Sequence, residues 1–293
     1  MEPESVHTRF LRAVDYIEEH LSEPVALADV AKQAGFSLHY FSRLFRVLTG
    51  EPFGAYLRGR RMTVAAERLV TEGRGLRLIE LAFACGYDSQ EAFTRAFKRA
   101  FGVTPGEYRR RRPAARTHQR ERIDAGLLSH LSEVLDMRPE IKEIDSFLVA
   151  GFRERFDAAS KHQIPALWGR FMPLLEEVPH RAGGTFGVCT NMSSDDGSFD
   201  YVAGVEVERV DRLPSGMVAE SLPRQTYAVF RHQLRSYDLH AELQPTLRWI
   251  FGTWLPGSDF EYVVGPDFER YPADFEPVPG KYLEIAIPVR RKG

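Results

Sequence analysis

The chain has 293 residues, of which 43% are hydrophobic and 27% are charged, and its formal net charge is -2. This length suits about two domains of ordinary globular composition, and no apolar run is long enough to cross a membrane, which argues against an integral membrane protein. The acidic start from Met1 to Glu4 lacks the basic and apolar regions of a secretory signal, and the two cysteines have no metal-binding spacing. We therefore expect a cytoplasmic protein that needs no metal ion or other cofactor.

The near-neutral total charge hides two regions of opposite sign. Residues 1–122 contain 21 Lys and Arg residues against 15 Asp and Glu residues, whereas residues 123–293 contain 18 against 26. A positive region suits a polyanion such as DNA, but a surplus this small also arises by chance. Charge alone therefore leaves nucleic-acid binding open, while the asymmetry indicates different partners for the two regions.

A helix-turn-helix pattern occurs twice before residue 110. In each copy a short, alanine-rich helix is followed by a glycine, Gly35 or Gly86, and then by a second helix. These glycines stand 51 residues apart, and the corresponding Phe41 and Phe93 stand 52 apart. Glycine suits such a turn because it adopts positive φ at little steric cost. One such motif also fits a generic helical bundle with solvated polar faces, but two in register favour DNA binding.

The second helix of each motif is amphipathic. Apolar residues recur three and four positions apart, so one face of each helix should be buried. The polar face should point outward, where Arg reads guanine and Gln reads adenine in the major groove. The expected buried faces comprise Phe41, Leu44, Phe45 and Leu48 in the first helix and Phe93, Ala96, Phe97 and Ala100 in the second.

Residues 7–112 resemble the DNA-binding domain of the AraC/XylS family of transcription regulators. The match is densest where Gly86 and Tyr87 are followed by Phe93, Arg95, Phe97, Lys98, Phe101, Gly102, Pro105 and Tyr108. The resemblance implies an all-α domain whose two helix-turn-helix units are joined by a long helix at about residues 53–72. These units would enter successive major grooves of duplex DNA, so that one chain reads both without dimerising.

The resemblance also assigns DNA contacts to the polar faces of both recognition helices. Base or groove contacts fall on His39, Ser42 and Arg43 in the first and on Gln90, Glu91, Thr94 and Arg95 in the second. Phosphate contacts, which set affinity and salt dependence, fall on Arg46, Lys98 and Arg99. Glu91 is unusual, because an acid facing DNA must accept from a cytosine amine or tolerate phosphate repulsion. The expected partners are double-stranded promoter or operator DNA and RNA polymerase.

An arginine-rich segment leads out of this region. Arg109 to Arg112 fit either an extended DNA footprint or a solvated helix end. Residues 113–137 are expected to form a linker and an amphipathic connecting helix, the latter at about 123–137. A second domain should then occupy residues 138–291.

The second domain is predicted to be α+β, because β-type and helical segments alternate in it. β-type segments are expected at about 141–156, 184–192 and 199–209, with a helix near 163–177. The order recurs with a strand near 217–232, a helix near 239–254, and strands near 260–271 and 281–290. Two β-α-β-β repeats are the simplest account.

Strand alternation locates a candidate ligand site in this domain. Leu283, Ile285, Ile287 and Val289 share the face expected to cover helices, whereas Tyr282 shares the other face with Glu284. Asp267, Glu269 and Tyr271 share one face of the preceding segment. An acid and tyrosines brought together beside tryptophans would form an apolar pocket with one negative charge, which favours lipophilic cations. The alternative is that the acids lie on a solvated sheet face.

Residues 139–291 resemble the GyrI-like effector-binding domain. The resemblance rests on Tyr201 to Val207, Leu213 to Met217, Tyr227 to His232, Trp254 to Pro256, Asp267 to Tyr271 and Glu284 to Val289. It implies a small-molecule effector held by a glutamate in a central groove, and Glu269 matches that residue best. The other side chains expected at the site are Tyr282, Trp168, Phe186 and Trp249.

Two other functions remain open for the second domain. A hydrolase would use Glu269 as acid and base with help from Tyr282, although the chain has no Gly-x-Ser-x-Gly motif, metal-ligand cluster or phosphate loop. The domain would alternatively bind a protein partner. We predict a transcription regulator that is not an enzyme and that senses a small, lipophilic or cationic effector.

Overall fold

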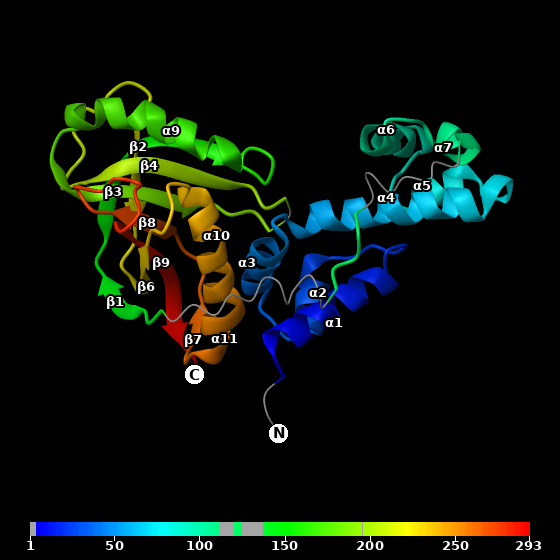
Figure 1. Cartoon of the computed structure of the whole chain (residues 1–293), viewed down its shortest axis with the longest axis horizontal. Coiled ribbons are helices and arrows are strands. Elements are labelled where there is room, and N and C mark those ends of the chain that lie inside the picture. The colour runs from blue at the N-terminus through cyan, green and yellow to red at the C-terminus, as the bar shows by residue number, and fades with distance from the viewer. Residues whose placement is uncertain (1–3, 112–119, 125–136, 195) are drawn as a thin grey trace. The chain divides into compact units, whose positions relative to one another are not determined.

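The computed structural model describes residues 4–111, 120–124, 137–194 and 196–293. The chain divides into two compact units, Met1–Leu38 with Glu51–Ser129 and His39–Gly50 with His130–Gly293 (Figure 1). Helix α3 (Leu38–Thr49) therefore belongs almost entirely to the second unit. The predicted connecting helix at about 123–137 falls largely outside the described residues.

All the described secondary structure of the first unit is helical, as predicted. The helix α4, which fills most of the range expected for the long helix, runs from Phe53 to Thr71. The other elements are α1 (Val6–Glu19), α2 (Leu27–Gln33), the short 3-10 turn η1 (Gly73–Gly75), α5 (Leu78–Ala84), α6 (Gln90–Phe101) and α7 (Pro105–Arg111). Among the described residues, no helix is both long enough and apolar enough to span a membrane.

The helices α5 and α6 form the second helix-turn-helix unit. Between them Gly86 has a φ of 77°, and a Cβ atom there would stand 2.7 Å from an Arg61 nitrogen, so the turn requires glycine. Ser89 caps α6 by accepting a hydrogen bond from the Ala92 amide at 3.1 Å. Phe93 and Phe97 are fully buried in a core shared with α4, α5 and α7, which fixes the opposite face of α6 toward solvent.

The second unit contains a curled, nine-stranded antiparallel sheet. Its order is β1-β6-β9-β8-β3-β4-β2-β5, with β7 paired to β9. The strands are β1 (Glu140–Ile144), β2 (Phe147–Phe156), β3 (Arg181–Thr190), β4 (Phe199–Val207), β5 (Val218–Leu222), β6 (Gln225–Gln233), β7 (Phe260–Tyr262), β8 (Asp267–Tyr271) and β9 (Tyr282–Arg291). Two β-α-β-β repeats, one built on β2, β3 and β4 and the other on β6, β8 and β9, confirm the predicted α+β fold.

The edge strands are exchanged between the repeats. β1 precedes the first repeat in the chain but pairs with β6 of the second, and β5 precedes the second but pairs with β2 of the first. The β-type segment predicted at about 141–156 and the strand predicted near 217–232 are therefore each divided into two strands with different partners. At the centre, β3 pairs with β8 and joins the repeats.

One helix covers each repeat on the same face of the sheet. The helix of the first repeat is α9 (Ile164–Phe171), preceded by η2 (Lys161–Gln163) and followed by η3 (Met172–Glu177). The helix of the second is α10 (Leu239–Trp249), which continues through a π-helical turn η4 (Ile250–Trp254) into α11 (Leu255–Gly257). Register links Gly187 to Glu269, Glu269 to Ile285 and Ile285 to Phe230, so these residues share the helix-covered face. The predicted inward face of β9 is confirmed by the burial of Leu283 and its alternate neighbours.

Candidate functional site

The second predicted recognition helix, α6, presents its polar residues to solvent. Arg95 is exposed on it, opposite the buried Phe93 and Phe97. Positive side chains outnumber acidic ones on this face, which gives it the charge needed to approach phosphates. The residues exposed with Arg95 are Glu91, Lys98 and Arg99, and Gln90 and Thr94 are partly buried.

The first predicted recognition helix, α3, holds its arginines differently. His39 is exposed and Ser42 is partly buried, but Arg43 is only 8% exposed. Arg43 forms a buried ion pair with Asp267 of β8, so the expectation that it points to solvent is wrong. Helical periodicity correctly places Arg43 on the polar face of α3. It does not indicate that the Asp267 carboxylate lies against that face.

Arg46, one turn further along α3, is also engaged within the second unit. Its guanidinium lies over the ring of Phe199, 4.5 Å from the centroid, and it donates a hydrogen bond to the carbonyl of Gly197. Burial and the neighbouring Arg43 lower the pKa of Arg46 to about 10, so it remains charged at neutral pH. Arg46, which was predicted to contact phosphate, therefore contacts Phe199 and Gly197 in this structure.

Glu269 stands at the centre of a group of aromatic side chains. The hydroxyl of Tyr201 donates to the Glu269 carboxylate at 3.1 Å, and the indole nitrogen of Trp168 donates to the Tyr201 hydroxyl at 3.1 Å. Trp168 also meets Tyr271 edge to face at 5.3 Å. Tyr201 therefore links Trp168 and Glu269, two of the residues expected at the ligand site.

The pKa of Glu269 lies close to neutral pH. Burial and the nearby carboxylate of Asp267 raise the pKa of Glu269 to about 7, against the opposing effects of the Tyr201 hydrogen bond and Arg43. Burial likewise raises the pKa of Tyr262 to about 12, helped by Asp267. A cation entering this site would favour the ionised form of Glu269, because opposite charges stabilise each other most where water is excluded.

Space for the Tyr201 and Glu269 side chains depends on Gly187. A Cβ atom at Gly187 would overlap both the Tyr201 hydroxyl and the Glu269 carboxylate. We expect Gly187→Ala to lower the free energy of unfolding by about 1 to 3 kcal/mol, the usual cost of overpacking. Urea denaturation measures this loss. The control Gly169→Ala, on α9 where no atom lies within 4 Å of the added Cβ, should be neutral or slightly stabilising, and an equal loss in both variants would contradict the assignment.

Three predicted ligand-binding residues are not brought to Glu269. In β9, Ile285 is the register partner of Glu269, so Tyr282 faces the opposite side of the sheet, where it lies 3.6 Å from the Arg231 guanidinium. Phe186 also faces the opposite side and packs against Phe147 and Phe268. The expectation that Tyr282 and Phe186 lie on the same face as Glu269 was wrong. The alternation of side chains along one strand does not reveal how that strand is aligned with the next.

Trp249 lies on the correct face but in a different place. It is 8% exposed and meets Phe230 edge to face at 6.0 Å, within the core between α10 and the second repeat. The pair that the hydrolase alternative requires, Glu269 with Tyr282, is also not formed, because the two residues lie on opposite faces.

A cavity of about 320 Å³ opens beside Asp267 within the second unit. Its walls come from α3 and from the loops and strand ends near β3, β5 and β8. The lining includes His39, Ser42, Cys189, Glu220, Tyr262 and Asp267. A ligand in this cavity would therefore touch both a carboxylate and the recognition helix.

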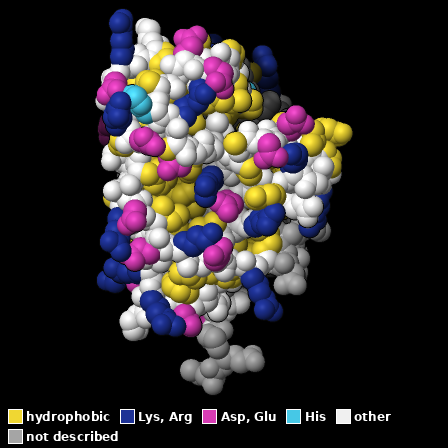
Figure 2. Space-filling view, turned by 90° about the vertical axis from the view of Figure 1, so that its left-hand side faces the viewer, with side chains coloured by type: hydrophobic (Ala, Val, Ile, Leu, Met, Phe, Trp, Pro, Cys, Tyr) yellow, Lys and Arg dark blue, Asp and Glu magenta, His cyan; other side chains and the backbone are white. Residues whose placement is uncertain are grey.

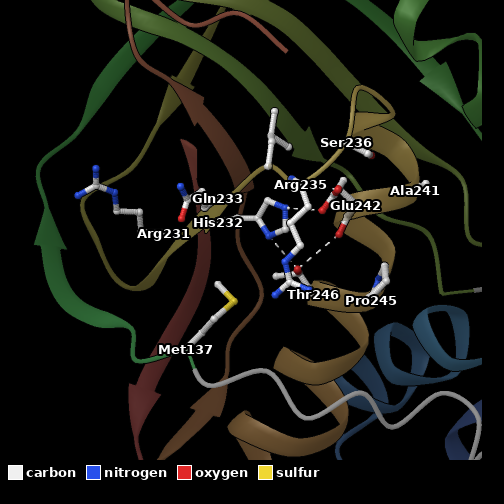
Figure 3. A pocket seen from close by; sticks show the side chains of 11 residues that line it. Met137, Arg231, His232, Gln233, Arg235, Ser236, Ala241, Glu242, Pro245 and Thr246 are labelled. Atoms are coloured by element: carbon white, nitrogen blue, oxygen red, sulfur yellow. Dashed lines mark hydrogen bonds and ion pairs between the residues drawn. The ribbon is translucent and has the colours of Figure 1, made fainter. Parts of the chain in front are cut away.

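A separate cavity of about 540 Å³ lies at the end of β6 beside α10 (Figure 3). There His232 points toward Thr246 and Glu242 of α10, with its Nδ1 3.0 Å from the Thr246 hydroxyl. The Nε2 atom lies 3.6 Å from the Glu242 carboxylate. Burial lowers the pKa of His232, which argues against a permanent charge on it and for a structural role. Among the described residues, no group of three His, Cys, Asp or Glu side chains is arranged to hold a metal ion.

A third cavity of about 270 Å³ lies on the other face of the sheet, where Phe186 and Phe268 contribute to its wall. Figure 2 shows the side of the second unit that lies at the left of Figure 1. On this side Lys and Arg side chains are interspersed with Asp and Glu, and hydrophobic groups lie between them. Such mixed charge does not favour a polyanion here, in contrast to α6.

Sequence reasoning missed Tyr201 and Gly187 as site residues. Tyr201 lies in the stretch Tyr201 to Val207 that supports the family resemblance, so a signal existed, but nothing in it indicated a partner on β8. Gly187 gave no signal beyond its presence in a predicted strand, where an isolated glycine suggests close approach of other groups. The decisive information is the pairing of β3 with β8, which places Gly187 opposite Glu269.

Comparison with known families accounts for both parts of the chain. Residues 137–290 match the GyrI-like small molecule binding domain, and residues 30–111 match a helix-turn-helix domain. The chain belongs to the GyrI-like family and carries an AraC-type helix-turn-helix region. This GyrI-like protein is a DNA-binding transcription regulator with a small-molecule-binding domain.

Similar proteins match either nearly the whole chain or one part of it. The transcriptional regulator Rob of Salmonella typhimurium is 26% identical over 285 residues, which cover 94% of this chain and 96% of Rob. The regulatory protein SoxS of the same organism is 40% identical over 98 residues, which cover 33% of this chain and 90% of SoxS. A solved structure of SAV2435 bound to tetraphenylphosphonium is 18% identical, covers 53% of this chain and 94% of that one, and has a TM-score of 0.42.

Proposed function

We propose that the GyrI-like domain of this regulator senses a lipophilic cation at Asp267 and Glu269. The supporting observation is that two carboxylates share one face of β8 and are partly or wholly removed from water. Glu269 lies beside the rings of Tyr201, Trp168 and Tyr271, and Asp267 is buried beside the cationic Arg43. Aromatic faces attract cations, and a desolvated carboxylate strengthens that attraction. An apolar neutral molecule would leave an ionised Glu269 without a charged partner.

The accommodation of Arg43 supports the same chemistry. Its guanidinium is a planar, delocalised cation, and it is held by Asp267 with its carbon 5.3 Å from the centroid of the Phe251 ring. An organic cation with aromatic or alkyl groups has the same needs, a negative partner and an apolar wall. We infer a sensor of such molecules and not a hydrolase.

We further propose that α6 and α3 make the DNA contacts assigned by the family resemblance. Arg95 with Gln90, Glu91 and Thr94 would contact base edges, and Lys98 and Arg99 would contact phosphates. His39, Ser42, Arg43 and Arg46 would do so from α3 when that helix is accessible. The regulator would act in the cytoplasm, at promoters, in contact with RNA polymerase.

The pH dependence of cation binding tests the effector site. Tetraphenylphosphonium, a lipophilic monocation, should bind through ionised Glu269, whose pKa is raised to about 7. Protonation removes the charge, so binding should be strong above this pKa and weaken as the pH falls through it. The affinity should therefore rise about tenfold from about pH 6 to about pH 8. Equilibrium dialysis measures it, and an affinity that is constant or falls with rising pH would contradict the proposal.

A further inference from the structure

The two helix-turn-helix units treat their matching arginines differently. Arg43 of α3 and Arg95 of α6 stand 52 residues apart, at corresponding positions of the repeated motif. Arg95 is exposed to solvent on α6, where it is free to approach DNA. Arg43 is 8% exposed and its charge is neutralised by Asp267. One arginine of the pair is therefore withheld from DNA in this arrangement.

The contacts of Arg43 are those that a cationic ligand would make. One terminal nitrogen binds the Asp267 carboxylate, and the other lies 3.5 Å from the sulfur of Met192. The ring of Phe251 lies alongside, 5.3 Å from the guanidinium carbon. A carboxylate, a polarisable sulfur and an aromatic ring together suit a soft organic cation.

Further contacts hold α3 within the second unit, and one of them engages Arg46, which was predicted to contact phosphate. The Tyr40 hydroxyl donates to the Phe251 carbonyl at 2.6 Å, and Arg46 lies over Phe199. From α10, Arg248 donates to the Val47 carbonyl at 3.4 Å. Figure 1 shows α3 and α10 side by side within this unit. Helix α3 is thus held against the effector domain by one buried ion pair and several further contacts.

Within the part of the chain that the structure describes, the site that holds the Arg43 guanidinium leaves one of its donors unpaired and adjoins a cavity. Among the described residues no hydrogen-bond acceptor reaches its buried Nε atom, and an unpaired buried donor weakens the association. The cavity of about 320 Å³ adjoins Asp267 and is lined by His39 and Ser42 of α3. A molecule entering that cavity therefore reaches the carboxylate and meets α3 at the same time.

We propose that Arg43 is a tethered occupant of the effector site, and that a cationic effector competes with it for Asp267 and thereby releases α3 to bind DNA. This inference rests on the proposed function, because it uses the same carboxylates, and adds how effector binding is coupled to DNA binding. Since the two cations exclude each other at Asp267, each lowers the affinity of the other by the same factor. The coupling therefore has a defined sign.

Hydrogen exchange tests the release in the unmodified, full-length protein. Amide exchange of residues 39–50 is followed by mass spectrometry without and with saturating tetraphenylphosphonium. Competition predicts faster exchange in this segment when the cation is bound, because α3 loses the Arg43–Asp267 ion pair that holds it against the effector domain. Slower or unchanged exchange in the presence of bound cation would overturn the inference.

Substitution of Arg43 tests the competition from the ligand side. Arg43→Ala removes the internal competitor, so tetraphenylphosphonium should bind about tenfold more tightly than to the unmodified protein. Arg43→Lys keeps a positive charge near Asp267 and should show a much smaller gain, which separates competition from simple loosening of the fold. The matched control is Arg95→Ala, which should leave cation binding unchanged.

The outcomes separate the two proposals. Cation binding that depends on Glu269 but is unchanged or weakened in Arg43→Ala would overturn the competition and leave the effector site standing. Absence of tetraphenylphosphonium binding to the unmodified protein and to both Arg43 variants would defeat the cation site and the competition together. Tighter binding in Arg43→Ala with faster exchange in residues 39–50 would support both.

Discussion

Replacing Arg95 by alanine should weaken binding to the specific DNA sequence by about 1 to 3 kcal/mol, the usual value of an arginine that reads a base. Arg95 is exposed on the polar face of α6, and that helix is fixed from behind by the buried Phe93 and Phe97. The substitution therefore removes a contact without disturbing the core. The measurement uses duplexes selected by the full-length protein from a random pool, with titrations of both the selected sequence and random DNA.

The matched control for this prediction is Arg77→Ala. Arg77 is also exposed and precedes α5, where it pairs with Glu80, so it lies outside the recognition helix. It should leave specific binding almost unchanged. Equal losses on selected and random duplexes for Arg95→Ala would indicate a phosphate contact, and no loss on either would remove Arg95 from the DNA interface.

Replacing Glu269 by glutamine should weaken tetraphenylphosphonium binding at about pH 8 by about tenfold, because the ionised carboxylate that attracts the cation is replaced by a neutral amide of the same shape. The amide retains a carbonyl oxygen to accept the Tyr201 hydrogen bond, so the local structure should persist. The rise in affinity between about pH 6 and about pH 8 should disappear as well, since Glu269 supplies it. Binding to random DNA should be unaffected.

Glu284→Gln provides the control for the ligand site. Glu284 lies on β9, one strand from Glu269, but it is the register partner of Arg270 and faces the opposite side of the sheet. Its substitution should leave cation affinity and pH dependence intact. A loss as large as that of Glu269→Gln would show that the cation binds on the other face, near Phe186 and Tyr282.

The helices were predictable because their signals are local. A repeated apolar spacing and the glycine before it located α6 closely, since both signals depend on residues a few positions apart. The long helix α4 was located by the family resemblance. The strands were less predictable. The β-type run at 141–156 has no break strong enough to show that the chain changes partner near Ser146, which separates β1 from β2. Pairing depends on residues far away in the sequence, so composition does not reveal it.

In the candidate ligand site, the sequence predicted which residues of one strand share a face, but not which residues of the neighbouring strand join them. Alternation correctly grouped Asp267, Glu269 and Tyr271, because neighbours on one strand follow a strict period of two. Whether Tyr282 joins them depends on the register of β8 and β9, and a shift of one residue reverses the answer. The burial of Arg43 lay beyond sequence reasoning altogether, because its partner is separated from it by more than two hundred positions.

The exchange of edge strands ties the two β-α-β-β repeats together during synthesis. β1 leaves the ribosome early but has no strand partner until β6 (Gln225–Gln233) has been made. β2 pairs with β4 first, but its other edge stays unpaired until β5 has been made. The central joint between β3 and β8 forms later still, after Tyr271 has emerged. The nascent sheet must therefore keep open edges for most of translation, and neither half is expected to survive as a separate fragment.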